Sequence, residues 1–218
     1  MLDIALYGII DPQIARGRSL AKLAGEAARS GMTLLQYRAK DIDTRTMIAE
    51  ARAIGAALAG TGVPLLINDR VDVALAAGAD GVHLGREDML PEDARRLLGP
   101  GAIIGATVKS SDDLAALVGT PISYACIGGV FSTAHKNNPD RPVGLDGLRK
   151  LRDEARVRLG GLPVGAIAGI TLDTVDAVFA AGADGVAVIG ALFGTDDVPG
   201  ATRSMADAIA QARRNTLS

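Results

Sequence analysis

One short pattern occurs twice in this chain of 218 residues, and it restricts the fold more than any other feature. The copies, VDVALAAGADGV and VDAVFAAGADGV, begin at Val71 and Val175, 104 residues apart, which is close to half the chain. Each copy predicts a helix, a glycine that ends it, an Asp-Gly turn and a buried strand. The connector between helix and strand is common enough to recur by chance, but its half-length offset favours equivalent units in two halves of one domain.

Short continuous apolar runs recur along the chain, as they do in parallel strands that are covered on both faces. We expect strands at residues 4–10, 32–37, 64–67, 81–84, 103–106, 122–127, 163–167 and 185–189. Ala-rich segments predict helices at 19–30, 43–59, 70–77, 91–98, 111–118, 145–158, 172–181 and 201–213. Eight strands alternating with eight helices predict a single TIM-barrel domain, a (β/α)₈ barrel with eight parallel strands, over residues 1–218. A doubly wound open sheet is the alternative, and the repeat favours the closed barrel.

The composition argues against several classes of partner. A net charge of −2 lacks the basic excess of a nucleic-acid binder, and three Tyr, three Phe and no Trp offer little for base stacking. No apolar run approaches the roughly 20 residues that cross a membrane. The first residues, Met1-Leu2-Asp3-Ile4, show no basic leader, so we expect a cytoplasmic protein without nucleic-acid or membrane partners.

Polar residues follow several of the predicted strands, at the barrel end where such folds carry their sites. Alternation along the chain predicts that Gln36, Arg38 and Lys40 point the same way, and the two cations suit a polyanionic ligand. Asp69 and Asp88 follow neighbouring strands, and two carboxylates with phosphate oxygens are typical of a Mg²⁺ site. A solvated loop edge is the alternative for the cations, and helix capping is the alternative for both aspartates.

Glycines follow the last two predicted strands, where barrels commonly bind phosphate through backbone N–H groups. Gly169 and Gly190 are the candidates, although glycine also ends strands for purely structural reasons. The longest loop covers residues 128–144, and loops of that length in compact domains are usually functional. His83 and Cys126 lie inside apolar runs, so we interpret the first as a hydrogen-bonded core residue and the second as a small core residue.

Six stretches match one known family in their order and spacing. They are QYRAK at 36–40, INDR at 67–70, DGVHLGRED at 80–88, GVFSTAHK at 129–136, AGI at 168–170 and GVAV at 185–188. Through them the chain resembles the thiamine phosphate synthase family from end to end. The resemblance implies an alkyl-transferring enzyme that joins hydroxymethylpyrimidine diphosphate to hydroxyethylthiazole phosphate, or to its carboxylated form. The products are thiamine phosphate and pyrophosphate.

The resemblance also implies a role for each matching residue. It gives Mg²⁺ to Asp69 and Asp88, and catalysis to the cations Arg38, Lys40 and Lys136. The pyrimidine diphosphate is held by Gln36, Arg38, Lys40, Asn68 and Thr107, and the departing pyrophosphate by Lys136. The thiazole phosphate is held by Thr133, His135 and the backbone at Gly169, Val188 and Ile189. In the family reaction the C–O bond to pyrophosphate breaks first, and the thiazole nitrogen then captures the methylene cation. A homodimer is a further expectation.

Several positions depart from the usual family pattern. Thr107 stands where a serine is common, Lys109 where a histidine is common, and Ser132 where a proline is common. His135 replaces a threonine and Gly190 replaces a serine, so each alters one hydroxyl at the expected thiazole-phosphate site. Two alternatives stay open: a sibling barrel that isomerises a thiazole carboxylate phosphate, and a non-catalytic protein that binds thiamine precursors.

Overall fold

Eight parallel strands form a closed barrel in the computed structural model, which describes residues 2–133 and 141–216. Each strand pairs with its neighbours in chain order, and Leu6 opposite Val186 closes the ring between the first and the last strand. The strands are β1 (Leu6–Ile10), β2 (Leu34–Tyr37), β3 (Leu65–Asn68), β4 (Gly81–Leu84), β5 (Ile103–Val108), β6 (Tyr124–Ile127), β7 (Val164–Ile167) and β8 (Gly185–Val188). The predicted barrel is confirmed, and the open sheet is excluded.

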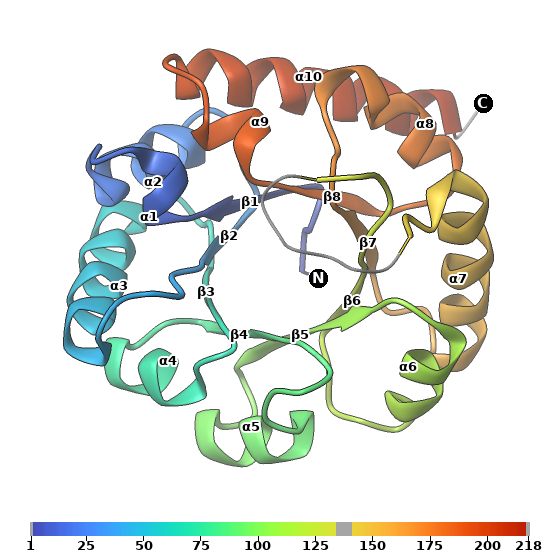
Figure 1. The fold of residues 1–218 in the computed structure, drawn as a ribbon, viewed down its shortest axis with the longest axis horizontal. Helices are drawn as coiled ribbons and strands as arrows, with labels where there is room; N and C mark the ends of the chain where they lie inside the picture. The colour runs from blue at the N-terminus through green and yellow to red at the C-terminus, as the bar shows by residue number, and fades with distance from the viewer. Residues whose placement is uncertain (1, 134–140, 217–218) are drawn as a thin grey trace.

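Helices surround the strands as an outer ring (Figure 1). They are α2 (Leu20–Ala28), α3 (Thr44–Leu58), α4 (Val71–Ala77), α5 (Pro91–Leu98), α6 (Ser111–Ala116), α7 (Gly144–Arg158), α8 (Val175–Ala180) and α10 (Val198–Thr216). The helix predicted at 172–181 is instead a 3₁₀ turn, η1 (Leu172–Thr174), followed by α8. The Thr174 hydroxyl accepts from the Thr171 N–H and donates to the Thr171 carbonyl, and such local bonds compete with a regular first turn.

Two further helices, α1 (Pro12–Ala15) and α9 (Gly190–Phe193), have no counterpart in the sequence prediction. They follow β1 and β8 directly, at the carboxyl ends of the strands. Each has only four residues, which is too short to show a helical period of apolar side chains. Both helices therefore shape the mouth of the barrel, although neither is visible as a pattern in the chain.

The repeated sequence performs the same structural task in both halves. The Asp80 carboxylate accepts the Leu65 N–H at 2.8 Å, and the Asp184 carboxylate accepts the Val164 N–H at 2.8 Å. Each aspartate thus joins the start of one strand to the start of the strand before it. The next residue must be glycine, since a Cβ on Gly81 would lie 1.8 Å from the Ile103 carbonyl oxygen.

Side chains alternate between two apolar layers. Tyr7 and Ile9 belong to a small cluster inside the barrel, whereas Leu6 and Ile10 pack between strands and helices. Cys126 is buried in the inner cluster, as expected, and burial raises the pKa of its thiol to about 12. In the described part of the chain, no helix combines the length and apolar character that a membrane span requires.

Candidate active site

Two adjoining cavities open at the carboxyl ends of the strands. The larger has a volume of about 570 Å³ and the smaller a volume of about 310 Å³. Five residues line both: Arg38, Asn68, His83, Thr107 and Lys109. The two cavities therefore adjoin at these five residues, which can contact a ligand in either cavity.

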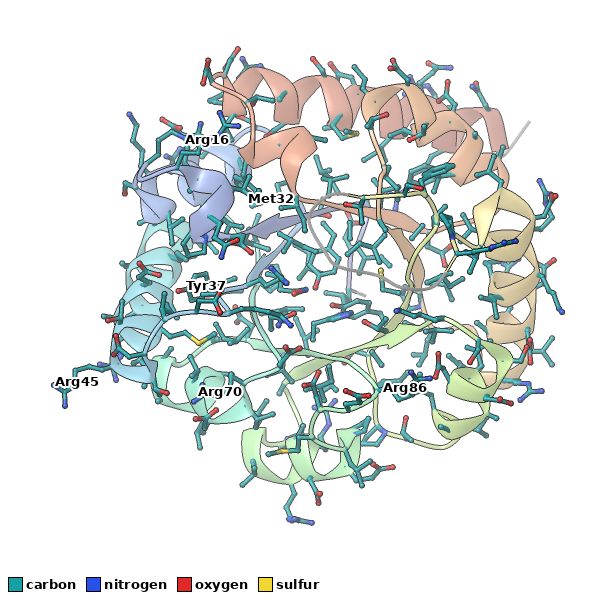
Figure 2. All side chains as sticks on the ribbon, viewed as in Figure 1. Arg16, Met32, Tyr37, Arg45, Arg70 and Arg86 are labelled. Atoms are coloured by element: carbon teal, nitrogen blue, oxygen red, sulfur yellow. The ribbon has the colours of Figure 1, made fainter. Side chains whose placement is uncertain are left out.

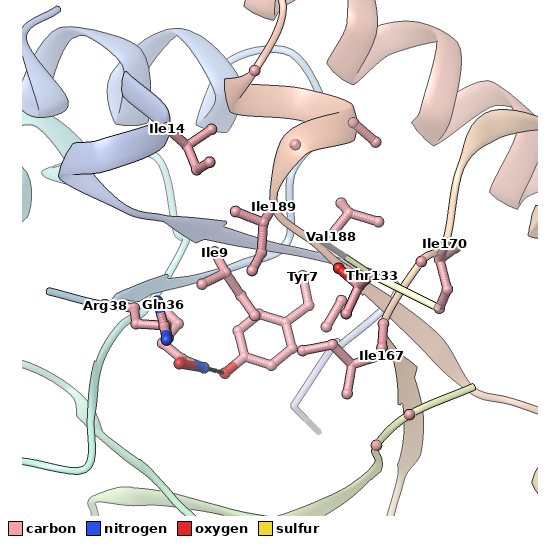
Figure 3. Close-up of a pocket in the computed structure, with 18 of the residues that line it drawn as sticks. Tyr7, Ile9, Ile14, Gln36, Arg38, Thr133, Ile167, Ile170, Val188 and Ile189 are labelled. Carbon is pink, nitrogen blue, oxygen red and sulfur yellow. Dashed lines mark hydrogen bonds between the residues drawn. The ribbon is translucent and has the colours of Figure 1, made fainter. Parts of the chain in front are cut away.

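The larger cavity is lined by both apolar and polar side chains. Tyr7 lies at its centre, and Ile9, Ile167 and Ile189 lie around the ring (Figure 3). Gln36 and Arg38 lie on one side of it, and Thr133 and Val188 on another. Of the expected substrate residues, this cavity is lined by Gln36, Arg38, Asn68, Thr107, Thr133, Gly169, Val188 and Ile189. Its shape and lining suit a heterocycle that carries a polar or anionic end.

The smaller cavity is strongly charged. Lys40, Asp69 and Asp88 line it beside the shared residue Arg38, as the sequence predicts. Arg86 also lines it, and Figure 2 shows this side chain across the barrel opening from Arg16. Cations and carboxylates that line one cavity suit a polyanion bound together with a metal ion.

Asp69 is held in an unusual backbone conformation next to the end of β3. Its φ of 62° lies in the left-handed region, which aspartate tolerates better than most residues. Its N–H donates to the His83 carbonyl at 2.9 Å, so the neighbouring strand fixes this conformation. The pKa of Asp69 is raised to about 6, first by burial and then by its hydrogen bond with Asp88 and that group's charge. The two carboxyl groups are therefore close together and share a partly buried space.

The capping alternative for the two aspartates is excluded. The residues that precede α4 and α5 are Arg70 and Leu90, and neither helix receives a side-chain cap. Asp88 instead accepts the Gly85 N–H at 2.6 Å, which holds the turn after β4. Both carboxyl groups line the smaller cavity, as the metal hypothesis requires.

The donors in the smaller cavity fit Mg²⁺. The charge of Asp88 helps to raise the pKa of Asp69, and a bound cation would offset the repulsion between the two carboxylates. Within residues 2–133 and 141–216, no group of three or more His, Cys, Asp or Glu side chains could enclose a metal ion. Mg²⁺ usually takes one or two carboxylates and completes its shell with water and substrate phosphates. Asp69 and Asp88 supply a set of that kind.

A buried chain of hydrogen bonds crosses the floor of the larger cavity, and no motif in the sequence marks its members as a unit. Gln36 donates to the Tyr7 hydroxyl, drawn as a dashed line in Figure 3, and Tyr124 donates to Tyr7 at 2.9 Å. His83 is hydrogen-bonded to Tyr124 and to Thr107, each at 2.8 Å. The expected hydrogen-bonded core role of His83 is confirmed, and this residue also lines both cavities. The one sequence pattern that points to Tyr7 as a residue of the barrel interior is strand alternation, which places it on the same face as Ile9.

Gly169 lies where a side chain would disturb the wall of the larger cavity. Its φ is 65°, and an added Cβ would lie 2.4 Å from the Ser132 carbonyl oxygen. The segment after β6 is fastened here, because the Val130 N–H donates to Ile167 and the Phe131 N–H donates to Ala168. Gly169 thus allows backbone to approach backbone at the edge of the cavity.

Gly190 does more than end a strand. It is the first residue of α9, and Gly190 and Ala191 both line the larger cavity beside Val188 and Ile189. The first N–H groups of a helix have no partner within it, and short helices at this end of a barrel commonly bind phosphate. His135 and Lys136, which complete the expected set, lie outside the described residues.

Comparisons with known proteins agree with the resemblance. The family model described as thiamine monophosphate synthase matches residues 6–192. A thiamine-phosphate synthase of Agrobacterium fabrum is 54% identical over 216 residues, covering 98% of each protein. One from Azorhizobium caulinodans is 39% identical over 212 residues, covering 97% of this chain and 98% of that protein.

A solved structure gives the same result. The thiamine phosphate pyrophosphorylase from Pyrococcus furiosus superposes with a TM-score of 0.84 at 34% identity, covering 97% of this chain and 98% of that one. With the matching family model and the full-length relatives, this places the chain in a family. The chain belongs to the thiamine monophosphate synthase family.

Proposed function

We propose that the protein is a thiamine phosphate synthase, an alkyl-transferring enzyme that condenses the pyrimidine diphosphate with the thiazole phosphate or its carboxylated form. The observation that carries the proposal is the pair of adjoining cavities. One is lined by the two expected metal-binding carboxylates, Asp69 and Asp88, and by the expected cations Arg38 and Lys40. The other is lined by Gly169 and the start of α9, and the two cavities share Arg38, Asn68 and Thr107. Full-length relatives that carry this name support the same assignment.

The two substrates are assigned to the cavities by their charges. The diphosphate lies in the smaller cavity, beside Arg38 and Lys40, and its pyrimidine reaches Gln36, Asn68 and Thr107. The thiazole lies in the larger cavity, with its phosphate at Thr133 and at the backbone of Gly169, Val188 and Ile189. The resemblance assigns thiazole-phosphate binding to His135 and pyrophosphate binding to Lys136, both of which lie outside the described residues. The reacting carbon and nitrogen then meet at the residues that both cavities share.

Asp69 and Asp88 would hold Mg²⁺, whose charge would offset the negative charge that develops on the leaving pyrophosphate. Arg38, Lys40 and Lys136 stabilise the same developing charge from the protein side. Pyrophosphate leaves as an anion that these positive charges stabilise, so none of the three side chains has to give it a proton.

The chemistry requires little acid–base catalysis. The bond between the pyrimidine methylene carbon and the bridging oxygen breaks, and its electron pair leaves with pyrophosphate. The thiazole nitrogen then donates its lone pair to that carbon, so the protein must chiefly hold the two rings close and in line. Where the thiazole is carboxylated, its carboxylate then leaves as CO2, and the electron pair left on the ring carbon takes up a proton from water. Cys126 takes no part, because burial raises the pKa of its thiol to about 12 and keeps it protonated at neutral pH.

The remaining expectations belong to the same proposal. Residues 1–218 form one domain, the protein acts in the cytoplasm, and it assembles as a homodimer. Size-exclusion chromatography with light scattering tests the last of these. A dimer gives twice the 22.3 kDa mass of one chain, and a single-chain mass would contradict it.

Product stoichiometry separates the proposal from its two alternatives. The purified protein is incubated with both phosphorylated precursors and Mg²⁺, and thiamine phosphate and pyrophosphate are measured together. A synthase forms them in equal amounts. An isomerase would convert the thiazole carboxylate phosphate without releasing pyrophosphate, and a binding protein would release nothing. The set of Arg38, Lys40, Asp69 and Asp88 favours the synthase, since neither alternative needs a metal–diphosphate site.

A further inference from the structure

Asp11 is a buried carboxylate at the mouth of the barrel, one residue beyond β1. Its side chain is 8% exposed and pairs with Arg38, whose side chain is 17% exposed, at a distance of 2.5 Å between Oδ2 and Nη1. The backbone brings the two together, because the Arg38 N–H donates to the Ile10 carbonyl at 2.9 Å. A charged pair this buried, one member of which lines both cavities, requires an explanation beyond surface solvation.

The two carboxylate oxygens of Asp11 have separate partners. Oδ2 takes the Arg38 guanidinium, and Oδ1 accepts the Gln13 N–H at 2.9 Å and so caps α1. The helix in turn supplies Ile14, and the residue after it, Arg16, to the wall of the larger cavity. One side chain therefore connects the cation of the diphosphate site with a wall of the other cavity.

The far end of α1 is fastened as well. Arg18 donates through Nε to the Ala15 carbonyl at 2.9 Å and through Nη1 to the Thr195 carbonyl at 2.6 Å, and it also donates to Phe193. The helix is thus held between Asp11 and the end of α9. Asp11 is not a loose surface group, because it sits at one end of an anchored element.

This arrangement allows Asp11 to fix the orientation of the Arg38 guanidinium. A free arginine side chain loses rotamer entropy when it is fixed, and this loss weakens its binding of an anion. A guanidinium has five N–H donors on three nitrogens, so a carboxylate that engages Nη1 leaves donors for a second anion. A direct substrate role for Asp11 is unfavourable, since a carboxylate repels a diphosphate.

Resting on the proposed function, we infer that Asp11 is a positioning residue: it holds Arg38 with its remaining donors directed to the diphosphate of the pyrimidine substrate. Asp11 contributes orientation, and Arg38 makes the contact with the substrate. Loss of the Asp11 charge therefore weakens the use of the pyrimidine diphosphate and spares that of the thiazole phosphate.

The test uses Asp11→Asn and Asp11→Ser, both of which retain a side-chain oxygen able to cap α1. Neither variant has a negative charge at position 11 to pair with the Arg38 guanidinium. We expect kcat/KM for the pyrimidine diphosphate to fall roughly tenfold or more, while KM for the thiazole phosphate stays within about twofold. Asp41→Asn is the matched control. Asp41 accepts a hydrogen bond from the Gln13 side chain of α1 at 3.2 Å, whereas the ion pair of Arg38 is made with Asp11. Its kinetics should match the wild type.

A binding measurement keeps this inference separate from the proposed function. Calorimetry with inorganic pyrophosphate and Mg²⁺ needs no turnover, and Asp11→Asn should weaken binding in the wild-type background but not in an Arg38→Ala background. Equal weakening in both backgrounds, equal losses for the two substrates, or tighter binding by Asp11→Asn would each overturn the inference. A wild type that binds pyrophosphate but forms no thiamine phosphate would instead contradict the proposed function alone.

Discussion

Asp69 shows how much one residue can depend on its neighbours. Burial and the nearby Asp88 raise its pKa from an ordinary 3.8 to about 6, so the folded protein binds this proton more tightly than the unfolded chain. A raised carboxyl pKa stabilises the fold at low pH, and that stability is lost as the pH rises from about 4 through about 6. The same side chain must be deprotonated to hold Mg²⁺.

The first prediction concerns this pH dependence. Without metal, the wild type should gain stability relative to Asp69→Asn as the pH falls from 7 to 5. The rise in melting temperature caused by Mg²⁺ should grow between pH 5 and 7.5, because the carboxylate is then increasingly available. Thermal melts across that range, with Mg²⁺ or with a chelator, measure both effects. A Mg²⁺ shift that does not change with pH would contradict the assignment of Asp69.

The second prediction concerns Gly169. Gly169→Ala adds a Cβ 2.4 Å from the Ser132 carbonyl oxygen, at a φ of 65°. We expect KM for the thiazole phosphate to rise roughly tenfold or more, because the shifted segment disturbs the phosphate contacts. Gly160→Ala is the matched control, since Gly160 has the same φ of 65° and no atom within 4 Å of an added Cβ. The control should cost about 1 kcal/mol of stability and leave the kinetics unchanged. Equal kinetics in the two variants would remove Gly169 from the site.

At the scale of elements, the repeated connectors make a third prediction. Asp80→Ala and Asp184→Ala each remove a 2.8 Å bond to the first N–H of a strand. Each should lower the free energy of unfolding by about 1 kcal/mol, and the double variant by their sum, because the two sites lie in different halves. Chemical denaturation measures these changes. The turnover number should not change, as both residues lie at the amino ends of the strands, away from the cavities. Clearly unequal losses would argue against equivalent halves.

The elements also show what a sequence can and cannot predict. The apolar runs and the repeat lead to all eight strands within a few residues, because fully buried strands carry continuous apolar side chains. Alternation leads to Gln36, Arg38 and Lys40, and the places after the predicted strands lead to Asp69, Asp88 and Gly169. The resemblance supplies the rest of the expected set. The helices α1 and α9 are not predicted, because four residues are too few to show the helical period of apolar side chains. The role of Asp11 is not predicted either, because its pairing with Arg38 depends on β1 lying beside β2.

At the scale of the whole molecule, the barrel brings residues from distant parts of the chain to one opening. Arg38, which follows β2, Asn68 of β3 and Thr107 of β5 each line both cavities. Because β1 pairs with β8, α1 lies beside α9, and residues of both helices line the larger cavity. A charged cavity that adjoins a more apolar one through shared lining residues suits the condensation of two phosphorylated rings.

We propose that Asp69 and Asp88 hold the metal ion that assists the departure of pyrophosphate. The most direct measurement is the rate of pyrophosphate release with both substrates, over a Mg²⁺ titration, for the wild type, Asp69→Asn and Asp72→Asn. Asparagine tolerates the backbone of residue 69, so the fold should survive, and Asp72 is an exposed control on α4 outside both cavities. We expect Asp69→Asn to be slower by roughly 100-fold or more, and Asp72→Asn to match the wild type. Wild-type release by Asp69→Asn, or release that does not depend on Mg²⁺, would contradict the account.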